Sequence, residues 1–417
     1  MAIIAKFTRT LPAPTATISG GFVFLLSAGW FTDADLGVAG SPIGGGANSI
    51  ANGGGDMQIF SNTGTTTRLP IEVVTFVTGG SPQCQVWVRT PSYTAGDTIT
   101  IGKDDTQSTQ PAVGAAFGRN AAWVDLESKY HCVTAPFTGA SDATGNHADL
   151  VASSGTWALD SINAAWNSGG TESVASLSYT GATPTAYTLE QFVRIPVLAN
   201  YAPIISMSFA RAWGEAGQAH GSSNGTVYAG ISVADRVVTS SGTLIAATWQ
   251  KWALVYNGTQ TEFFIDGVSK GVSTTTTTPK AIGGFLLANR DNSGSTVDYK
   301  IKNASYSLTA KTANQLLSES INEKDPDNFG TSSEYILVGG GGISVTGDTA
   351  AFDFTALAGT VDLTGEILVT GSTASFDYSA ISGAIDLTGQ LLVTGQTANF
   401  DYIALPGTID LTGEIIV

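Results

Sequence analysis

Residues 248–272 read "TWQKWALVYNGTQTEFFIDGVSKGV". The stretch contains three short runs rich in aromatic and β-branched residues, which favour strands. An Asn-Gly pair at 257–258 separates the first two runs, and an Asp-Gly pair at 266–267 separates the last two. These pairs supply the positive φ angles that tight hairpins need. The stretch therefore predicts three consecutive antiparallel strands joined by two hairpins.

The pattern Trp-x-x-Trp-Ala-Leu-Val-Tyr-Asn-Gly-Thr, followed by Phe-Phe-Ile-Asp-Gly, is similar to the signature hairpins of laminin-G-like domains. Residues 186–198, "AYTLEQFVRIPVL", alternate like a half-buried strand. "GGFLLANR" (283–290) and "VDYKIKNASYSLTAKTANQLLSESIN" (297–322) match the closing strands and short helix of such domains. The resemblance implies a laminin-G-like, concanavalin-like β-sandwich over residues 151–325.

The region before it also reads as strands, with "LPIEVVTFV" (69–77), "CQVWVRTP" (84–91) and "GDTITIGK" (96–103). Residues 20–150 resemble a β-sandwich family of unassigned function. The matching residues are Asp56, Phe60, Leu69, Pro70, Glu72, Val86, Trp87, Val88, Pro91, Ala95, Gly96 and Asp97. The sequence departs from that family at "IGK" (101–103), where a Tyr-Gly turn is usual. The resemblance implies an N-terminal β-sandwich over residues 1–150 and no enzymatic activity.

The last part of the chain, residues 343–417, repeats a 24-residue unit three times, after a Gly-rich linker over 326–342. Each unit holds two short alternating stretches, too small to bury an apolar face alone. Tandem units become stable by stacking on one another or by packing against copies in neighbouring chains. We expect an oligomerisation or docking segment that uses the repeated residues Val345, Val369, Val393, Phe352, Phe376 and Phe400.

Composition agrees with an all-β chain of several domains. Of 417 residues, 50 are Gly, 12% are charged and 42% are hydrophobic, which disfavours long helices and still allows sizeable cores. The net charge of −16 argues against a nucleic-acid or anionic-membrane surface, because both need clustered Lys and Arg. "FVFLL" at 22–26 is too short to insert into a membrane. Cys84 and Cys132 show no metal-site spacing, and either pair with each other or are simply buried.

The laminin-G-like resemblance implies binding of glycans or proteins through rim loops, often with Ca²⁺. The candidate rim is "RAWGEAGQAHGSSNG" (211–225) together with "NRDNSGS" (289–295). Trp213 and His220 are suited to stacking on a sugar ring, and Asp291, next to Arg290, to holding a cation. The alternative is a solvated loop with Trp213 tucked into the sandwich.

The tryptophans Trp87, Trp123, Trp157, Trp249 and Trp252 are expected on strands and in the core. Asp353, Asp377 and Asp401 of the repeats are either turn or outer-face residues or a Ca²⁺ ladder.

The sequence does not predict an enzyme or a cofactor. Glycosidases need two facing carboxylates, and no Glu-x-Asp-x-Glu string occurs. The three histidines, His131, His147 and His220, have no metal-ligand spacing and lie beside no Gly-x-Ser-x-Gly elbow. Glycan hydrolysis therefore remains only a third hypothesis.

Three features lead to a functional hypothesis: sandwiches of an adhesive type, an N-terminus without the apolar run of a secretory signal, and a repeat that needs partners. Together they resemble a bacteriophage virion protein of the tail-fibre or capsid-fibre type, made in the host cytoplasm. The expected partners are the chain itself, as a homo-oligomer and specifically a trimer, other virion proteins, and a glycan of the host surface. The alternative is a bacterial carbohydrate-binding or adhesive surface protein.

Overall fold

We analysed a computed structural model of the chain. It describes residues 3–31, 42–43, 45, 49–62, 64–80, 82–131, 139–147, 149–152, 157–159, 166–168, 174–176, 183–195, 197–198, 204–206, 218–232, 235–274, 279, 286–288, 300–337, 343–356, 360–380, 384–394, 397–404 and 408–416.

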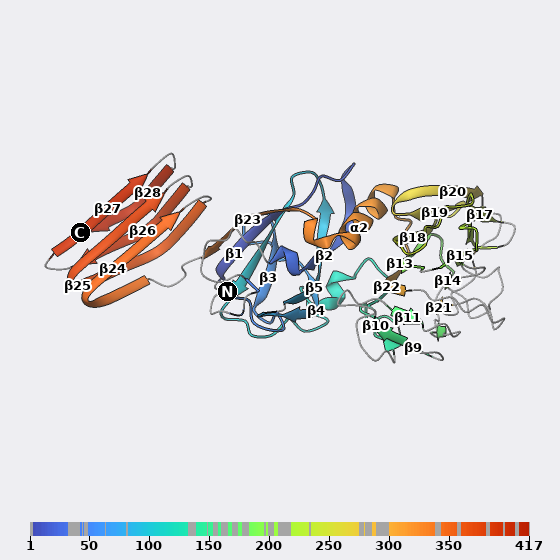
Figure 1. Cartoon of the computed structure of the whole chain (residues 1–417), viewed down its shortest axis with the longest axis horizontal. Coiled ribbons are helices and arrows are strands. Elements are labelled where there is room, and N and C mark those ends of the chain that lie inside the picture. The colour runs from blue at the N-terminus through green and yellow to red at the C-terminus, as the bar shows by residue number, and fades with distance from the viewer. Residues whose placement is uncertain are drawn as a thin grey trace.

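The molecule is elongated, with three β structures in a row (Figure 1). The repeat array lies at one end, an N-terminal sandwich in the middle, and a second sandwich at the other end. Helix α2 (Ala313–Lys324) lies at the boundary between the two sandwiches. The predicted all-β fold class is confirmed. No helix in the described part of the chain is long and apolar enough to cross a membrane.

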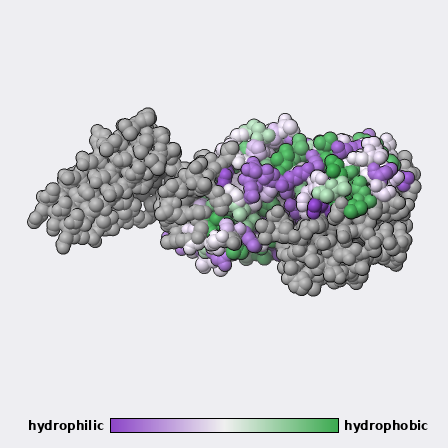
Figure 2. Space-filling view, in the orientation of Figure 1, coloured by the Kyte–Doolittle hydropathy of each residue, from purple (hydrophilic) through white to green (hydrophobic). Residues whose placement is uncertain are grey.

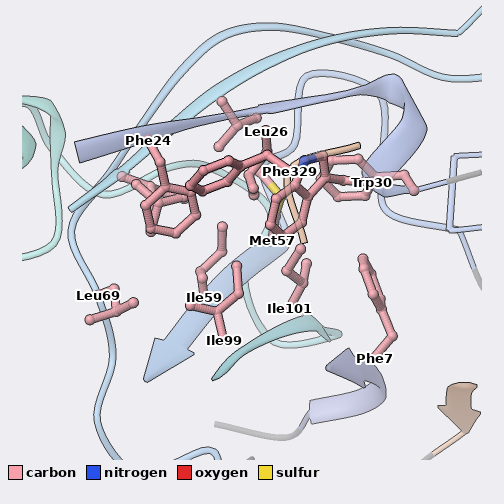
Figure 3. Packing of buried hydrophobic residues seen from close by; sticks show 14 of the residues in the cluster. Phe7, Phe24, Leu26, Trp30, Met57, Ile59, Leu69, Ile99, Ile101 and Phe329 are labelled. Atoms are coloured by element: carbon pink, nitrogen blue, oxygen red, sulfur yellow. The ribbon is translucent and has the colours of Figure 1, made fainter. Parts of the chain in front are cut away.

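The N-terminal sandwich packs a four-stranded sheet on a three-stranded sheet. The first has the order β23–β1–β6–β3, with bounds Thr331–Leu337, Ile3–Thr10, Thr98–Asp104 and Met57–Ser61. The second has the order β2–β5–β4, with bounds Ile18–Ser27, Gln83–Tyr93 and Ile71–Val77. Their inner faces meet in one aromatic and aliphatic core, part of which is shown in Figure 3. The pairing of β5 with both β2 and β4 agrees with the strands expected at 69–77 and 84–91.

The segment after α2 returns to this first sandwich and completes it. Strand β23 pairs antiparallel with β1, and Phe329 enters the core beside Phe24. The short 3-10 helix η2 (Pro326–Asn328) packs against its counterpart η1 (Ala28–Trp30), and the Trp30 indole donates to the Pro326 carbonyl. Residues 331–337, which we placed in a linker over 326–342, thus form an edge strand of the N-terminal sheet. The linker expectation is wrong for this part. By pairing with β1, these residues gain backbone hydrogen bonds that an unpaired linker lacks.

The second sandwich consists of a six-stranded and an eight-stranded antiparallel sheet. The six-stranded order is β20–β19–β18–β13–β22–β7, with bounds Val268–Thr274, Gln260–Ile265, Trp249–Tyr256, Tyr187–Arg194, Lys300–Ser307 and Ser128–Tyr130. The eight-stranded order is β17–β16–β15–β14–β21–β12–β9–β8, with bounds Arg236–Val238, Val227–Gly230, Gln218–Gly221, Ile204–Ser206, Leu286–Ala288, Val174–Ser176, Leu150–Ala152 and Gly139–Ala140. A small separate ribbon pairs β10 (Trp157–Leu159) with β11 (Trp166–Ser168).

The two hairpins predicted at 248–272 are present as β18, β19 and β20. Gly258 has φ +99°, and Asp266 and Gly267 have φ +54° and +74°, so both turns use the left-handed backbone that their residues permit. The predicted helix after the closing strands is α2, where the Thr312 hydroxyl caps the first turn by accepting from Gln315 N–H. Strands β7 and β8 lie before residue 150 yet belong to the second sandwich. The two sandwiches therefore exchange segments near the boundary that we expected at residue 150.

The repeat array forms a parallel sheet in which equivalent residues of successive units pair. Its strands are β24, β25, β26, β27 and β28, with bounds Ile343–Ala356, Thr360–Ala380, Ala384–Thr394, Thr397–Ala404 and Thr408–Ile416. Val345 pairs with Val369, and Phe376 pairs with both Phe352 and Phe400. Every pair is separated by 24 residues, so the sequence period equals the strand register. Each unit therefore pairs with the next unit rather than with itself.

Candidate functional site

The predicted rim residues lie almost entirely outside the described part of the chain. Trp213, Arg290 and Asp291 are outside it, and so is Cys132, whereas Cys84 is a free thiol. His220 lies on β15, where it pairs with Ile204 of β14 and Tyr228 of β16. The rim therefore stays a prediction.

Among the tryptophans expected in the core, Trp252 faces the interior of the second sandwich and is buried. Trp157 lies on β10, and Trp249 stacks on Phe192 at 5.3 Å between ring centres. Trp87 and Trp123 are also buried, but they pack outside both sandwich cores, in a small cluster between the sandwiches. Trp123 follows helix α1 (Arg119–Ala122) and is not on a strand, so that part of the expectation is wrong.

The junction between the two sandwiches is built on an aromatic cluster of Trp87, Trp123 and His131. Trp87 lies on the outward face of β5, and its ring centre is 5.4 Å from those of both Trp123 and His131. The Lys129 ammonium, at the start of the second sandwich, lies 4.5 Å from the Trp87 ring centre. Burial lowers the pKa of Lys129. The face of the first sandwich thus provides an aromatic platform for a strand of the second, a favourable setting for a buried cation.

Glu72 is the acidic centre of this junction. It lies on β4 opposite Trp87, and its Oε2 accepts from Trp123 Nε1 at 2.5 Å and lies 2.8 Å from His131 Nε2. Burial alone would raise the pKa of Glu72, but the nearby His131 and the two hydrogen bonds lower it below its ordinary value. Glu72 is therefore held as a carboxylate in a largely buried position.

Two polar side chains, Asn303 and Glu72, hold the His131 ring. The Asn303 amide nitrogen donates to Glu323 Oε2 at 3.1 Å, which turns the amide oxygen toward His131 Nδ1 at 3.3 Å. His131 Nε2 faces the Glu72 carboxylate. Both ring nitrogens thus lie within hydrogen-bond distance of a side-chain oxygen, and these two contacts fix the orientation of the ring.

A cavity of about 430 Å³ opens beside this Glu72–His131 pair. Its apolar walls come mainly from β4, from the loop before α1 and from the segment after Gly139, with Ile71, Val73, Val74, Pro111, Val113, Ala140 and Ala143. Its polar groups are Glu72, Gln110, Arg119, His131 and Ser141. A volume in the range of about 300–1,000 Å³, apolar walls and a few convergent polar groups are the features of a small-molecule site.

On the other side of the aromatic cluster lies a buried ion-pair cluster of Lys251, Lys311, Glu190, Glu319 and Glu323. It joins the outward face of β13 and β18 to helix α2. Lys251 Nζ lies 3.2 Å from Glu190, 2.9 Å from Glu319 and 2.7 Å from Glu323. Lys311 Nζ contacts Glu190 and lies 2.9 Å from Glu319.

The pKa values in the ion-pair cluster follow from burial and from these neighbours. Burial alone would raise the pKa of Glu190, but Lys251 and Lys311 hold it well below its ordinary value. Burial and the adjacent Glu190 charge together raise the pKa of Glu319. Burial alone would lower the pKa of Lys251, but its three carboxylate partners raise it well above the ordinary value. Lys251, with three carboxylate partners, and Lys311, with two, are therefore the cations that hold the ion-pair cluster together.

The two polar centres are connected. Asn303 of β22 bonds His131 with its oxygen and Glu323 with its nitrogen, and Glu323 contacts Lys251. The chain of contacts runs from the cavity, through the aromatic cluster, to α2. Helix α2 is in turn fixed to the first sandwich, because the Asn322 amide accepts from Leu25 N–H at 2.7 Å and donates to Leu25 C=O at 3.0 Å. The junction is thus a connection in which both sandwiches and the helix share buried polar contacts.

A second surface feature lies at the edge of the six-stranded sheet. Val268 and Val272 of edge strand β20 and Val238 of the adjacent β17 are each 53% exposed. Figure 2 shows apolar patches over this end of the molecule, beside the more hydrophilic surface near the junction. No group of three or more His, Cys, Asp or Glu side chains positioned for a metal ion occurs among the described residues.

Sequence reasoning missed the junction residues. Glu72 was noted only as part of a family pattern, and Glu319, Glu323 and Lys251 were not singled out. A signal existed: Glu319 and Glu323 are four residues apart on one helix face, and Lys251 occupies an outward position on a strand otherwise rich in apolar residues. Their mutual contact, however, depends on how distant segments meet.

Comparison with known proteins identifies one part of the chain. Residues 167–315 match the family model of the concanavalin A-like lectin/glucanases superfamily. A search of curated protein sequences found no match.

Similar solved structures include the binding domain of Paraclostridial Mosquitocidal Protein 1, with 11% identity, 46% of this chain and 51% of that chain covered, and a TM-score of 0.38. Another is domain 4 of AbnA, a GH43 extracellular arabinanase from Geobacillus stearothermophilus, solved in complex with arabinotriose. It is 15% identical, the match covers 47% of this chain and 98% of that chain, and the TM-score is 0.37. The botulinum neurotoxin serotype D binding domain is 9% identical, the match covers 47% of this chain and 51% of that chain, and the TM-score is 0.38.

The chain thus spans about half the length of the first of these proteins. The family match and the two packed sheets agree, and residues 167–315 therefore form a concanavalin A-like lectin/glucanase domain.

Proposed function

We propose that this protein is a non-enzymatic attachment protein, a structural component of a bacteriophage tail or capsid fibre. In this role its concanavalin-like sandwich binds a host-surface glycan or a neighbouring virion protein. The observation that carries the proposal is the joining of three parts in one chain. A lectin-like sandwich is fixed by a buried junction to a second sandwich, and a repeat array follows at the opposite end (Figure 1).

The buried junction supports a role in display. A flexible tether would lose orientational freedom when it binds, whereas a pre-organised head avoids much of that cost. Lys251, Glu319 and Asn322 fix α2 to both sandwiches, so that the orientation of the lectin-like sandwich is set before any ligand arrives.

The array supports a role in assembly. Its strands pair with a fixed offset of 24 residues, and a strand at the edge of such a sheet offers unpaired backbone groups to a neighbour. We propose that copies of the array associate, with Phe352, Phe376, Phe400, Val345, Val369 and Val393 contributing apolar surface, and that the assembly is a trimer.

Two experiments test the function. Mass spectrometry of purified phage particles should detect the chain as a virion component. Fluorescently labelled protein should bind the surface of the matching host cells, and a fragment lacking the lectin-like sandwich should not. Detection in the bacterial envelope without phage particles would instead support a bacterial adhesive protein. Turnover of host polysaccharide that is lost on substitution of a single acidic residue would contradict the non-enzymatic role.

A further inference from the structure

The cavity beside Glu72 contains the guanidinium group of Arg119. Arg119 lines the cavity, and its Nε is buried without a hydrogen-bond partner. In the described part of the chain no carboxylate forms an ion pair with it. Glu72, whose pKa Arg119 helps to lower, already uses Oε2 to bind Trp123 and His131.

The Glu72 carboxylate in the same cavity already has other partners. His131 Nε2 lies 2.8 Å from Glu72 Oε2, the oxygen that also accepts from Trp123. Arg119 is the only Lys or Arg among the described residues that line the cavity. A buried guanidinium donor without a partner costs free energy, and an anion that accepts from it recovers that cost.

The walls restrict the kind of anion. Among the described residues that line the cavity, seven of twelve are apolar: Ile71, Val73, Val74, Pro111, Val113, Ala140 and Ala143. A single guanidinium group suits a single negative charge better than a phosphate dianion, which needs more donors. The guanidinium fork matches the two oxygens of a carboxylate. A volume of about 430 Å³ accepts a molecule larger than a free ion, with carbon–hydrogen faces against the walls.

We propose that this cavity is a binding site for a small carboxylate-bearing molecule, specifically an acidic monosaccharide unit, with Arg119 as the carboxylate-binding residue. Glu72 and His131 fix the wall, and Asn303 connects them to the ion-pair cluster at α2. The site lies at the junction, away from the rim segments 211–225 and 289–295, and the inference does not rest on the proposed attachment function.

The test uses the full chain, D-glucuronate as the probe and D-glucose as its uncharged counterpart, measured by isothermal titration calorimetry at low salt. We expect glucuronate to bind at least about tenfold more tightly than glucose, with affinity in the millimolar range or better. Arg119→Gln should weaken glucuronate binding about 10- to 100-fold, the range for a charge-assisted hydrogen bond. Lys270→Gln removes the same charge from exposed strand β20 and should change the affinity less than about twofold.

A second variant keeps the test decisive if Arg119→Gln does not fold. Val113 is 47% exposed at the cavity wall, so Val113→Glu should fold and should repel glucuronate more than glucose. Equal binding of the two sugars, unchanged glucuronate binding by Arg119→Gln or Val113→Glu, or no saturable binding of glucuronate up to about 10 mM would overturn the inference. Host-cell binding is measured separately. If Arg119→Gln retains cell binding and loses glucuronate, both proposals stand; if cells are never bound but glucuronate is, only the attachment function fails.

Discussion

Replacing Lys251 by methionine should destabilise the junction strongly. Lys251 is buried, and its ammonium lies within 3.2 Å of three carboxylates. At an effective dielectric constant of about 20, each contact near 3 Å corresponds to about 6 kcal/mol of attraction, offset by the cost of burying the charges. Removing one partner of a buried pair costs about 3–5 kcal/mol, because the other charge stays buried without compensation. We expect a loss of that size from a total of about 5–15 kcal/mol.

The matched control is Lys324→Met at the end of helix α2, which carries Glu319 and Glu323. Lys324 Nζ lies 2.6 Å from Asp266, but its side chain is 36% exposed, so the loss should be at most about 1 kcal/mol. Urea unfolding followed by tryptophan fluorescence measures both, since Trp87 and Trp123 lie beside the ion-pair cluster. Equal stability of the two variants would refute the assignment of the ion-pair cluster as the main polar contact of the junction.

The pH dependence provides an independent check on the same cluster. Glu190 and Glu323 have pKa values below their ordinary 4.5, so the stability they contribute is present above pH 4.5 and is lost as pH falls through their folded pKa values. Lys251 has a pKa above its ordinary 10.5, so its contribution is present below pH 10.5 and is lost as pH rises through the folded value. Glu319, with a raised pKa, acts in the opposite sense to the other two acids. The difference between wild type and Lys251→Met should therefore be largest between these limits and should shrink in acid, where protonation removes the uncompensated carboxylates.

Three further substitutions test other contacts. Glu72→Gln should cost about 1.5–3 kcal/mol, because the hydrogen bonds that the Glu72 carboxylate makes with His131 and Trp123 lose their charge. Chemical unfolding measures this loss, and a loss below about 0.5 kcal/mol would contradict an ionised Glu72 at the junction. Asn322→Ala leaves the N–H and C=O groups of Leu25 without their amide partner. Hydrogen exchange at the Leu25 amide should therefore speed up at least about tenfold, which corresponds to about 1.4 kcal/mol. Unchanged exchange would argue against docking of α2 on β2. Gly267→Ala should cost more than about 2 kcal/mol, because a Cβ there would meet Leu317 Cα at 2.2 Å. The control Gly242→Ala has a similar φ and open space around it, and should cost about 1 kcal/mol. Equal shifts of the melting temperature in the two variants would contradict the close approach of α2.

Local sequence signals predicted those parts of the fold that local chemistry decides. Asn257-Gly258 and Asp266-Gly267 determine their turns by themselves. The sequence spacing of Val345, Val369 and Val393 equals the register in which the strands of the array pair. The predicted strands of both sandwiches followed from alternation in short runs.

What could not be predicted depends on contacts between distant segments. Strand β23 pairs with β1 across more than 300 residues, and β7 joins the sheet of the second sandwich although it precedes residue 150. Glu72, His131 and Asn303 come from three separate segments, and no spacing along the chain relates them. The same holds for Lys251 and Glu319, whose contact requires α2 to lie on the outer face of the six-stranded sheet.

Sedimentation velocity of the whole chain, compared with a chain that ends at residue 337, tests the proposed assembly most directly. The truncation keeps β23 and therefore the complete N-terminal sandwich. We predict that the truncated chain sediments as a monomer and that the whole chain, of 42.8 kDa, sediments as a trimer of about 128 kDa (three times 42.8). A whole chain that remains a 42.8 kDa monomer at micromolar concentration would contradict the proposal that the array joins copies of the protein.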